Sequence, residues 1–174
     1  IAGRRTIGFI EQRTQDRFKR MLLDQWAYFD DLDTHTVSMG LRITDLLGIA
    51  PHFAVVPPCA SLTQQLALTA RLLPFDGKPF AVLHPFPKFR YKMWHDTGWI
   101  AMVQWLNQRG LSVVLSGGPD AAECEYADNL IRNVPCGGPG DVLNLVGCLS
   151  LGETAELIRR AALFIGPDTA TTHI

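Results

Sequence analysis

The residues with the clearest chemical potential lie at the end of this 174-residue sequence, where the apolar run 163–165 breaks at Gly166-Pro167. The polar turn that follows consists of Asp168, Thr169, Ala170, Thr171, Thr172 and His173. Hydroxyl groups and the free N–H groups of a helix N-terminus bind anions such as phosphate. We therefore predict that this turn opens a helix, that Asp168 caps it, and that the turn holds the phosphates of a ligand.

A second candidate loop follows His84 and contains three cations among aromatic residues. The cations are Lys88, Arg90 and Lys92. A lysine supplies a point charge and an arginine a rigid fork of donors, and both suit a diphosphate. The alternative is that these charges only solvate the loop, but its position directly after a predicted strand favours a binding function.

A third loop contains the paired glycines Gly117 and Gly118 between Ser116 and Pro119. Glycines allow a ligand to approach the backbone closely. The spacing is neither that of a dinucleotide fingerprint nor that of a Walker loop, so a plain turn is an equal alternative. The glycine-rich stretch 137–140 is interpreted as a turn. Because motifs of hydrolases and metalloproteases are also missing, the chemistry predicted is the binding and positioning of a phosphorylated ligand.

Bringing these loops together requires a parallel sheet. Apolar patterns predict strands at 80–84, 111–115, 142–146 and 162–165. Helical spacing predicts intervening helices at about 99–110, 121–132 and 152–161, the last with Leu157 and Ile158 buried. This alternation is typical of an α/β fold with helices on the faces of a parallel sheet, whose strand ends lie on one edge. Ligands of such sheets bind outside the carboxyl ends of the strands.

The first third of the chain has a different pattern. It predicts a short strand at 4–9, a loop-rich stretch at 11–33 and a helix at 34–47 that Gly48 ends. Three prolines then indicate a linker at 50–61, followed by a helix to about residue 73.

We therefore expect two domains. One would comprise residues 1–58 with the linker, and the other residues 59–174 with the parallel sheet. The absence of an initial Met and the end just past the polar turn lead us to expect further residues on both sides.

Composition excludes several classes of protein. The net charge is −1, from 16 basic and 17 acidic residues, which gives no support for a nucleic-acid partner. A basic cluster near the N-terminus is interpreted as a solvated face; it comprises Arg4, Arg5, Arg13, Arg17, Lys19 and Arg20. No apolar run is long enough to span a bilayer. The cysteines Cys59, Cys124, Cys136 and Cys148 have no metal-binding spacing, so we expect free thiols and no metal.

Six segments, in order, resemble the C-terminal half of glycosyltransferase family 9, the ADP-heptose:lipopolysaccharide heptosyltransferases. They are 80–85 (FAVLHP), 92–94 with Trp99, 113–119 (VVLSGGP), 144–147 (NLVG), 157–162 and 164–173 (FIGPDTATTH). The resemblance covers about residues 75–174, and residues 1–60 only loosely, as the tail of the N-terminal domain. It implies a GT-B architecture of two Rossmann-like domains. Residues 1–58 would then be the remnant of an incomplete N-terminal α/β domain with its linker, and residues 59–174 the Rossmann-like nucleotide-sugar-binding domain, truncated at its C-terminus.

The resemblance also implies an inverting transfer of a heptose from a nucleotide sugar, ADP-heptose, to a lipopolysaccharide core or lipid A-linked acceptor, without a cofactor. Lys92 looks like the lysine that neutralises the diphosphate. Residues 168–171 look like the family's D-T-G turn, with Ala170 where glycine is usual, and His173 closes the motif. The catalytic assignment is thus Lys92 with Asp168, and the general base is expected upstream of residue 1.

The same resemblance places Ser116, Gly117 and Gly118 beside the base and ribose, and Glu123 or Glu125 near the nucleoside. It implies a cytoplasmic enzyme at the inner face of the inner membrane, where the N-terminal basic cluster could touch anionic groups.

Two alternatives stay open at this point: a sugar-nucleotide 2-epimerase of the same architecture, and a non-catalytic nucleotide-binding fragment. A dehydrogenase is disfavoured because the glycine spacing of NAD sites is missing.

Overall fold

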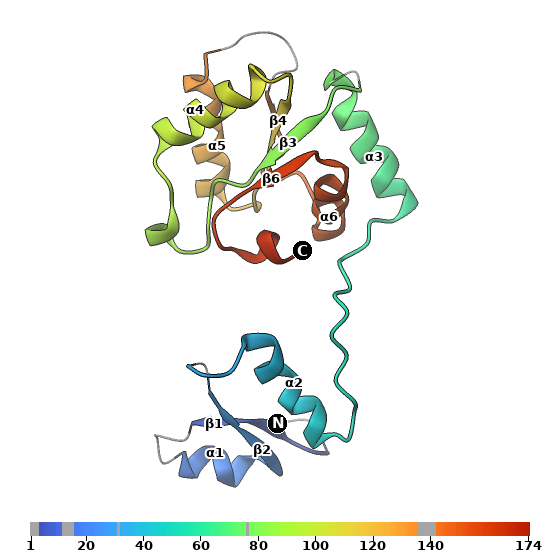
Figure 1. Cartoon of the computed structure of the whole chain (residues 1–174), viewed down its shortest axis with the longest axis vertical. Coiled ribbons are helices and arrows are strands. Elements are labelled where there is room, and N and C mark those ends of the chain that lie inside the picture. The colour runs from blue at the N-terminus through green and yellow to red at the C-terminus, as the bar shows by residue number, and fades with distance from the viewer. Residues whose placement is uncertain (1–3, 12–15, 31, 76, 136–141) are drawn as a thin grey trace. The chain divides into compact units, whose positions relative to one another are not determined.

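The computed structural model describes residues 4–11, 16–30, 32–75, 77–135 and 142–174. The chain forms two compact units, Ile1–Val55 and Val56–Ile174, hereafter unit 1 and unit 2. Figure 1 shows the helices and strands of both. The stretch 50–61 that was predicted as a linker forms neither helix nor strand. The division into functional domains at residues 58 and 59 stays a prediction.

Unit 2 is built on a four-stranded sheet in the order β5-β4-β3-β6. Its strands are β3 (Phe80–Leu83), β4 (Ser112–Leu115), β5 (Val142–Asn144) and β6 (Leu163–Ile165). All three pairings are parallel, which confirms the predicted sheet and places all four carboxyl ends on one edge.

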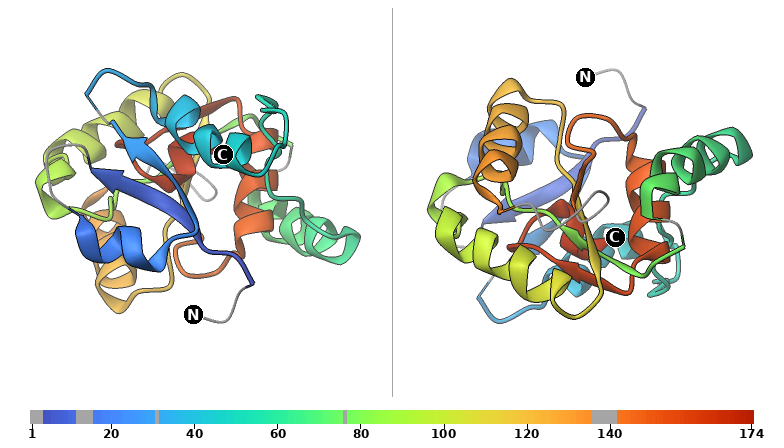
Figure 2. Two further views of the ribbon diagram at one scale, coloured as in Figure 1. Left: turned by 90° about the horizontal axis from the view of Figure 1, so that it is seen from below. Right: turned by 90° about the horizontal axis from the view of Figure 1, so that it is seen from above.

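Helices cover both faces of this sheet (Figures 1 and 2). Helices α4 (Asp96–Asn107) and α5 (Ala121–Asn133) lie on one face, and α3 (Leu62–Leu72) and α6 (Leu151–Arg160) lie on the other. Alternation along β3 feeds both cores: Ala81 and Leu83 join the first cluster, and Phe80 and Val82 the second. The predicted burial of α6 is confirmed for Leu157, whereas Ile158 is only partly buried.

Helices α3 and α6, which cover the same face of the sheet, begin with the same capping arrangement. Ser61 and Gln64 form a capping box at the start of α3, and Ser150 and Glu153 form one at the start of α6. Each box satisfies N–H groups that the first helical turn leaves unpaired, which explains why both helices begin where they do.

The strand order contains a reversal. After β3 the chain moves outward to β4 and then β5, and it returns to place β6 on the other side of β3. The point of reversal therefore lies between β3 and β6. In open α/β sheets this is where the loops diverge and leave a crevice for a ligand.

Unit 1 contains a parallel pair of strands, β1 (Ile7–Glu11) and β2 (Gln25–Phe29), joined through α1 (Arg17–Leu22). Helix α2 (Thr36–Leu46) follows and stops before Gly48, whose φ of 69° suits glycine. The predicted loop-rich stretch 11–33 was wrong, since it contains α1 and β2. Alternating Trp26, Tyr28 and neighbouring residues favour a strand, and the flanking acids obscured that pattern.

Candidate functional site

The structure joins two residues that the sequence separates by 76 positions. Lys92 ends the short 3₁₀ helix η2 (Arg90–Lys92) after β3, and Asp168 lies in the turn after β6. The Lys92 Nζ lies 2.5 Å from Oδ2 of Asp168 and 3.4 Å from its backbone oxygen. This ion pair therefore forms where the loops after β3 and β6 meet, which is the point where the strand order reverses.

The charges of this pair reinforce each other. The hydrogen bond from Lys92 lowers the pKa of Asp168, with a further contribution from His173, whose Nε2 lies 3.1 Å from Oδ1 of Asp168. The same contact with Asp168 raises the pKa of Lys92. At neutral pH the lysine is therefore charged. An ammonium has three donors, and Asp168 engages no more than two of them, so a donor is left for a ligand.

The turn itself differs from the prediction in one respect. Asp168 does not cap a helix: the following segment is a single 3₁₀ turn, η3 (Ala170–His173), with Thr169 at its N-cap and no side-chain capping bond. The carboxylate is instead held by Lys92 and His173, because charge-assisted bonds are stronger than bonds to a neutral N–H.

Hydroxyl groups of the turn have different surroundings. Thr172 Oγ1 donates to the backbone oxygen of Pro167 at 2.7 Å and so closes the turn. Thr171 Oγ1 is buried and has no hydrogen-bond partner, one of only two such side-chain atoms among the described residues. An unpaired buried hydroxyl is unfavourable, and it identifies a polar group that a ligand could satisfy. Ala170 is exposed.

Next to the point where the strand order reverses lies a buried polar pair that the sequence did not single out. His84 directly follows β3, and its Nδ1 lies 3.1 Å from Oγ of Ser116, which follows β4. Both side chains are buried, and burial lowers the pKa of His84, so its imidazole is neutral at neutral pH. Only one signal could have indicated His84: a polar residue that directly follows an apolar strand.

Ser116 is only 1% exposed and contacts His84; its predicted place beside the base and ribose stays a prediction. Gly166 allows this close packing, because a Cβ at that position would lie 3.3 Å from both Cβ and the backbone oxygen of His84.

The paired glycines Gly117 and Gly118 leave space for the side chain of Glu123. The N–H of Gly118 donates to Oε2 of Glu123 at 2.6 Å, and a Cβ at Gly117 would lie 3.0 Å from that oxygen. Glu123 therefore organises the loop after β4. Glu125 is exposed on the same helix. No described contact links either glutamate to the pair of Lys92 and Asp168.

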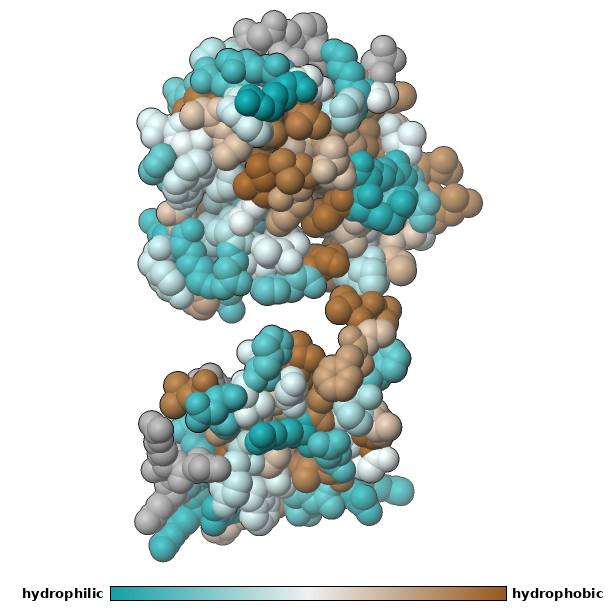
Figure 3. Space-filling model, in the orientation of Figure 1, coloured by the Kyte–Doolittle hydropathy of each residue, from teal (hydrophilic) through white to brown (hydrophobic). Residues whose placement is uncertain are grey.

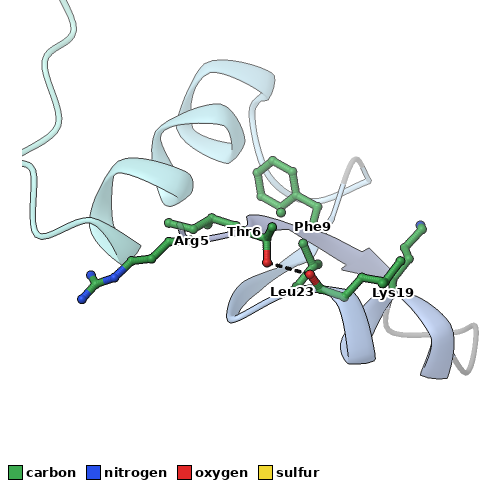
Figure 4. A pocket seen from close by; sticks show the side chains of 8 residues that line it. Arg5, Thr6, Phe9, Lys19 and Leu23 are labelled. Carbon is green, nitrogen blue, oxygen red and sulfur yellow. Dashed lines mark hydrogen bonds between the residues drawn. The ribbon is translucent and has the colours of Figure 1, made fainter. Parts of the chain in front are cut away.

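Two residues of the N-terminal basic cluster, Lys19 and Arg20, have partners within unit 1. Lys19 pairs with Asp16 at 3.1 Å, and the guanidinium of Arg20 lies 5.7 Å from the ring centre of Trp26. Arg5 and Lys19 lie at the rim of a pocket of about 490 Å³ (Figure 4). The pocket is lined by Arg5, Thr6, Ile7, Gly8, Phe9, Lys19, Leu22 and Leu23.

Other sequence predictions have these outcomes. Cys59, Cys124 and Cys148 are free thiols, while Cys136, Arg13 and the turn at 137–140 lie outside the described residues. Within the described ranges, no group of three potential metal ligands occurs, and no helix has the length and hydropathy needed to cross a bilayer.

Solved structures share this fold. A family 9 glycosyltransferase from Veillonella parvula matches 97% of this chain and 47% of its own, with a TM-score of 0.77 and 13% identity. The E. coli ADP-heptose lipopolysaccharide heptosyltransferase II matches 95% of this chain and 51% of its own, with a TM-score of 0.74 and 16% identity. The E. coli heptosyltransferase WaaC with ADP has a TM-score of 0.63 and 18% identity, over 96% of this chain and 50% of its own. The GT-B half predicted from the sequence is thereby confirmed.

Sequence relatives are consistent with these structures. Two E. coli proteins named lipopolysaccharide heptosyltransferase 3 are similar to this chain. One is 33% identical to it over 98 residues, and the other, from strain K12, is 28% identical to it over 142 residues. These matches cover 56% and 81% of this chain but only 28% and 40% of the relatives, so the chain spans less than half of their length. The family profile described as "Glycosyltransferase family 9 (heptosyltransferase)" matches residues 4–174. The chain therefore belongs to glycosyltransferase family 9.

Proposed function

We propose that this chain is the donor-binding part of an inverting glycosyltransferase that moves a heptose from ADP-heptose to a lipopolysaccharide core acceptor. Unit 2 would bind the nucleotide sugar, and unit 1 would belong to the acceptor side. The single observation that carries the proposal is the meeting of Lys92 and Asp168 at the point where the strand order reverses. A cation held there lies where open α/β sheets bind their ligands.

The expected reaction is one displacement at the anomeric carbon of the donor sugar. An acceptor hydroxyl oxygen attacks that carbon, the bond from the carbon to the diphosphate oxygen breaks, and the nucleoside diphosphate leaves with the electron pair. The proton of the attacking hydroxyl passes to a general base, for which the family resemblance indicates an aspartate ahead of residue 1. None of the residues described above is assigned that role.

Within this scheme Lys92 stabilises the negative charge that grows on the leaving diphosphate. Asp168 is a positioning residue, because it holds the ammonium through two oxygens and is itself held by His173. The unpaired hydroxyl of Thr171 would donate to a phosphate oxygen. No step requires a metal or cofactor, and the nucleotide sugar is a substrate.

Calorimetric titration with ADP, UDP, GDP and CMP tests the donor assignment. We expect ADP to bind most tightly, and Lys92→Gln to weaken it by about 10- to 100-fold, the range of one charge-assisted hydrogen bond. Lys78→Gln is the matched control, since this exposed lysine precedes β3 at the opposite edge of the sheet.

Unchanged ADP affinity in Lys92→Gln would contradict the site. A preference for another nucleotide would keep the site and change the donor. Conversion of a nucleotide sugar without any acceptor would favour the epimerase alternative.

A further inference from the structure

One side of unit 2 exposes aromatic and basic side chains that make no hydrogen bond or ion pair with Lys92 or Asp168. They lie on the segment before α4, on α4 and directly after it, and we call them the aromatic–basic face: Lys88–Tyr91, Trp94, Trp105 and Arg109. Figure 1 shows α4 and this segment along one side of unit 2. Lys92, although next to Tyr91, belongs to the donor site and is not included.

The aromatic rings of this face are open to solvent. Tyr91 is 81% exposed, and Phe89, Trp94 and Trp105 are between 42% and 48% exposed. Phe89 and Tyr91 stack on each other with ring centres 5.7 Å apart and an angle of 18° between the rings. Large exposed apolar residues that gather on one surface indicate an interaction site rather than ordinary surface composition. Figure 3 shows that unit 2 also exposes apolar side chains around α3.

An apolar groove continues the face along α4. It has a volume of about 330 Å³ and is lined by Trp94, Gly98, Ala101, Met102 and Trp105. The residues from Gly98 to Trp105 recur at helical spacing, beside the stripe of Trp99, Val103 and Leu106 that fills the core. Gly98 is buried, and a Cβ there would lie 2.7 Å from the Trp94 ring and 2.5 Å from Cε1 of His95, so glycine lets both rings pack against the start of α4.

The charges on this face are positive. Lys88 Nζ lies 5.5 Å from the centre of the Phe89 ring, and Arg109 Cζ lies 3.7 Å from that of Trp105. The nearest acid in sequence is Asp96, which is already engaged, as it accepts a hydrogen bond of 2.8 Å from Tyr126 on α5. Among the described residues, no salt bridge neutralises Lys88, Arg90 or Arg109.

We propose that the aromatic–basic face docks unit 2 on an anionic lipid bilayer. Trp and Tyr favour the headgroup region, where the ring contacts apolar chains and the polar atom contacts water. Lys and Arg next to them bind lipid phosphates, and each adds to the attraction of an anionic leaflet. The apolar and the electrostatic attraction act together because the rings and the cations share one surface. The groove between Trp94 and Trp105 would receive apolar parts of the lipids. The proposal does not depend on the proposed function, since it requires no donor.

Vesicle flotation of the 174-residue chain tests this proposal. We expect the chain to float with vesicles of phosphatidylcholine and phosphatidylglycerol and to float weakly with phosphatidylcholine alone. Lys88→Gln with Arg109→Gln should lower the partition coefficient about 10- to 30-fold, since each cation near an anionic surface contributes about fivefold. Trp105→Ser, which lies on α4 away from Lys92, should lower it severalfold, and it should stay low at low salt because the apolar contribution is lost.

Matched controls use residues elsewhere. Phe53→Ser removes an aromatic that is 66% exposed outside the face, and Lys78→Gln with Arg132→Gln removes two exposed cations. Both should bind vesicles like the unchanged chain. Calorimetry with ADP on Trp105→Ser separates this surface from the donor site: ADP affinity should be retained while vesicle binding is lowered.

Three results would overturn the proposal. The first is equal flotation with neutral and anionic vesicles that the variants leave unchanged. The second is a lipid-free dimer, seen by sedimentation, that Trp105→Ser dissociates, because the face would then bind a second copy. The third is tighter binding to a single-stranded oligonucleotide than to anionic vesicles, which would assign the face to base stacking.

Discussion

Glu156 is predicted to be the ionised group on which the stability of the α3–α6 layer most depends. It is buried on α6, with its carboxylate held by Arg159 at 2.6 and 2.7 Å and by Arg160 at 2.6 Å. Arg160 also donates to Thr69 Oγ1 on α3 at 2.8 Å, so the cluster ties α6 to α3. Because α6 leads directly into β6, which carries the Asp168 turn, this clamp positions one side of the donor site.

The magnitude follows from the pKa. The hydrogen bond from Arg159, supported by Arg160, lowers the pKa of Glu156 from 4.5 to about 2. A shift of that size corresponds to at most about 3 kcal/mol of unfolding free energy at neutral pH. The Arg159 side chain is 70% exposed, so water and salt screen its part of the interaction. We therefore expect Glu156→Gln to lower the free energy of unfolding by about 1–2 kcal/mol at pH 7.

The sign of the pH dependence is fixed by the lowered pKa. The contribution of Glu156 is complete above the ordinary value of 4.5 and is lost as the pH falls from there towards 2. Urea unfolding of both proteins at pH 7 and at decreasing pH below 4.5 measures this, so the difference between them should shrink as the pH falls. Tryptophan fluorescence reports mainly on unit 2, which contains Trp94, Trp99 and Trp105, whereas unit 1 contains only Trp26.

Two controls decide whether the reasoning holds. Glu125→Gln removes an exposed glutamate of α5 and should change stability by less than about 0.5 kcal/mol. Arg160→Gln should cost more than Arg159→Gln, because Arg160 is 25% exposed and also reaches Thr69. A Glu156→Gln protein as stable as the unchanged chain at pH 7, or a difference that does not change between pH 7 and pH 3, would refute the argument.

Two further predictions concern the donor site. Thr171→Val removes the unpaired buried hydroxyl, so the chain without ligand should keep its free energy of unfolding or gain up to about 1 kcal/mol, while its ADP affinity falls severalfold. Thr172→Val loses the hydrogen bond to Pro167 and should instead lower the free energy of unfolding. Loss of stability in Thr171→Val with unchanged ADP binding would contradict this. Gly166→Ala places a Cβ 3.3 Å from the His84 backbone oxygen, which should push β6 away from β3, so calorimetry should show weaker ADP binding. Gly40→Ala is the control, because a Cβ there meets open space and ADP binding should be unchanged. Equal affinities in the two glycine variants would argue against the contact.

The parallel sheet and its helices could be predicted from the sequence because their signals are local. Apolar runs such as 80–83 and 112–115 are fully buried strands, and the caps at Ser61 and Ser150 start helices within four residues of sequence. The prediction failed at 11–33 because the elements there are short: α1 has six residues, none of them buried, and a segment of that length is too short for its apolar spacing to separate a helix from a loop.

The site was only half predictable for a related reason. The sequence indicated which loops contain phosphate-binding residues, since these residues directly follow the strands. It indicated Asp168 as a helix cap, and it could not show that the Asp168 carboxylate pairs with Lys92, 76 positions away, or that Ser116 contacts His84, 32 positions away. Glu123 likewise fills the space that Gly117 and Gly118 leave.

By itself, the sequence determined the α/β class, the parallel order of elements, the family and the residue types of the donor loops, since these depend on periodicity and on motifs in linear order. Tertiary structure alone decided that β6 lies beside β3, and therefore that Lys92 meets Asp168, that His84 rests on Ser116, and that Thr171 keeps an unpaired hydroxyl. The physical reason is that strand order is set by how α3–α6 and α4–α5 bury the two faces of the sheet, and only that packing brings distant polar groups within hydrogen-bonding distance.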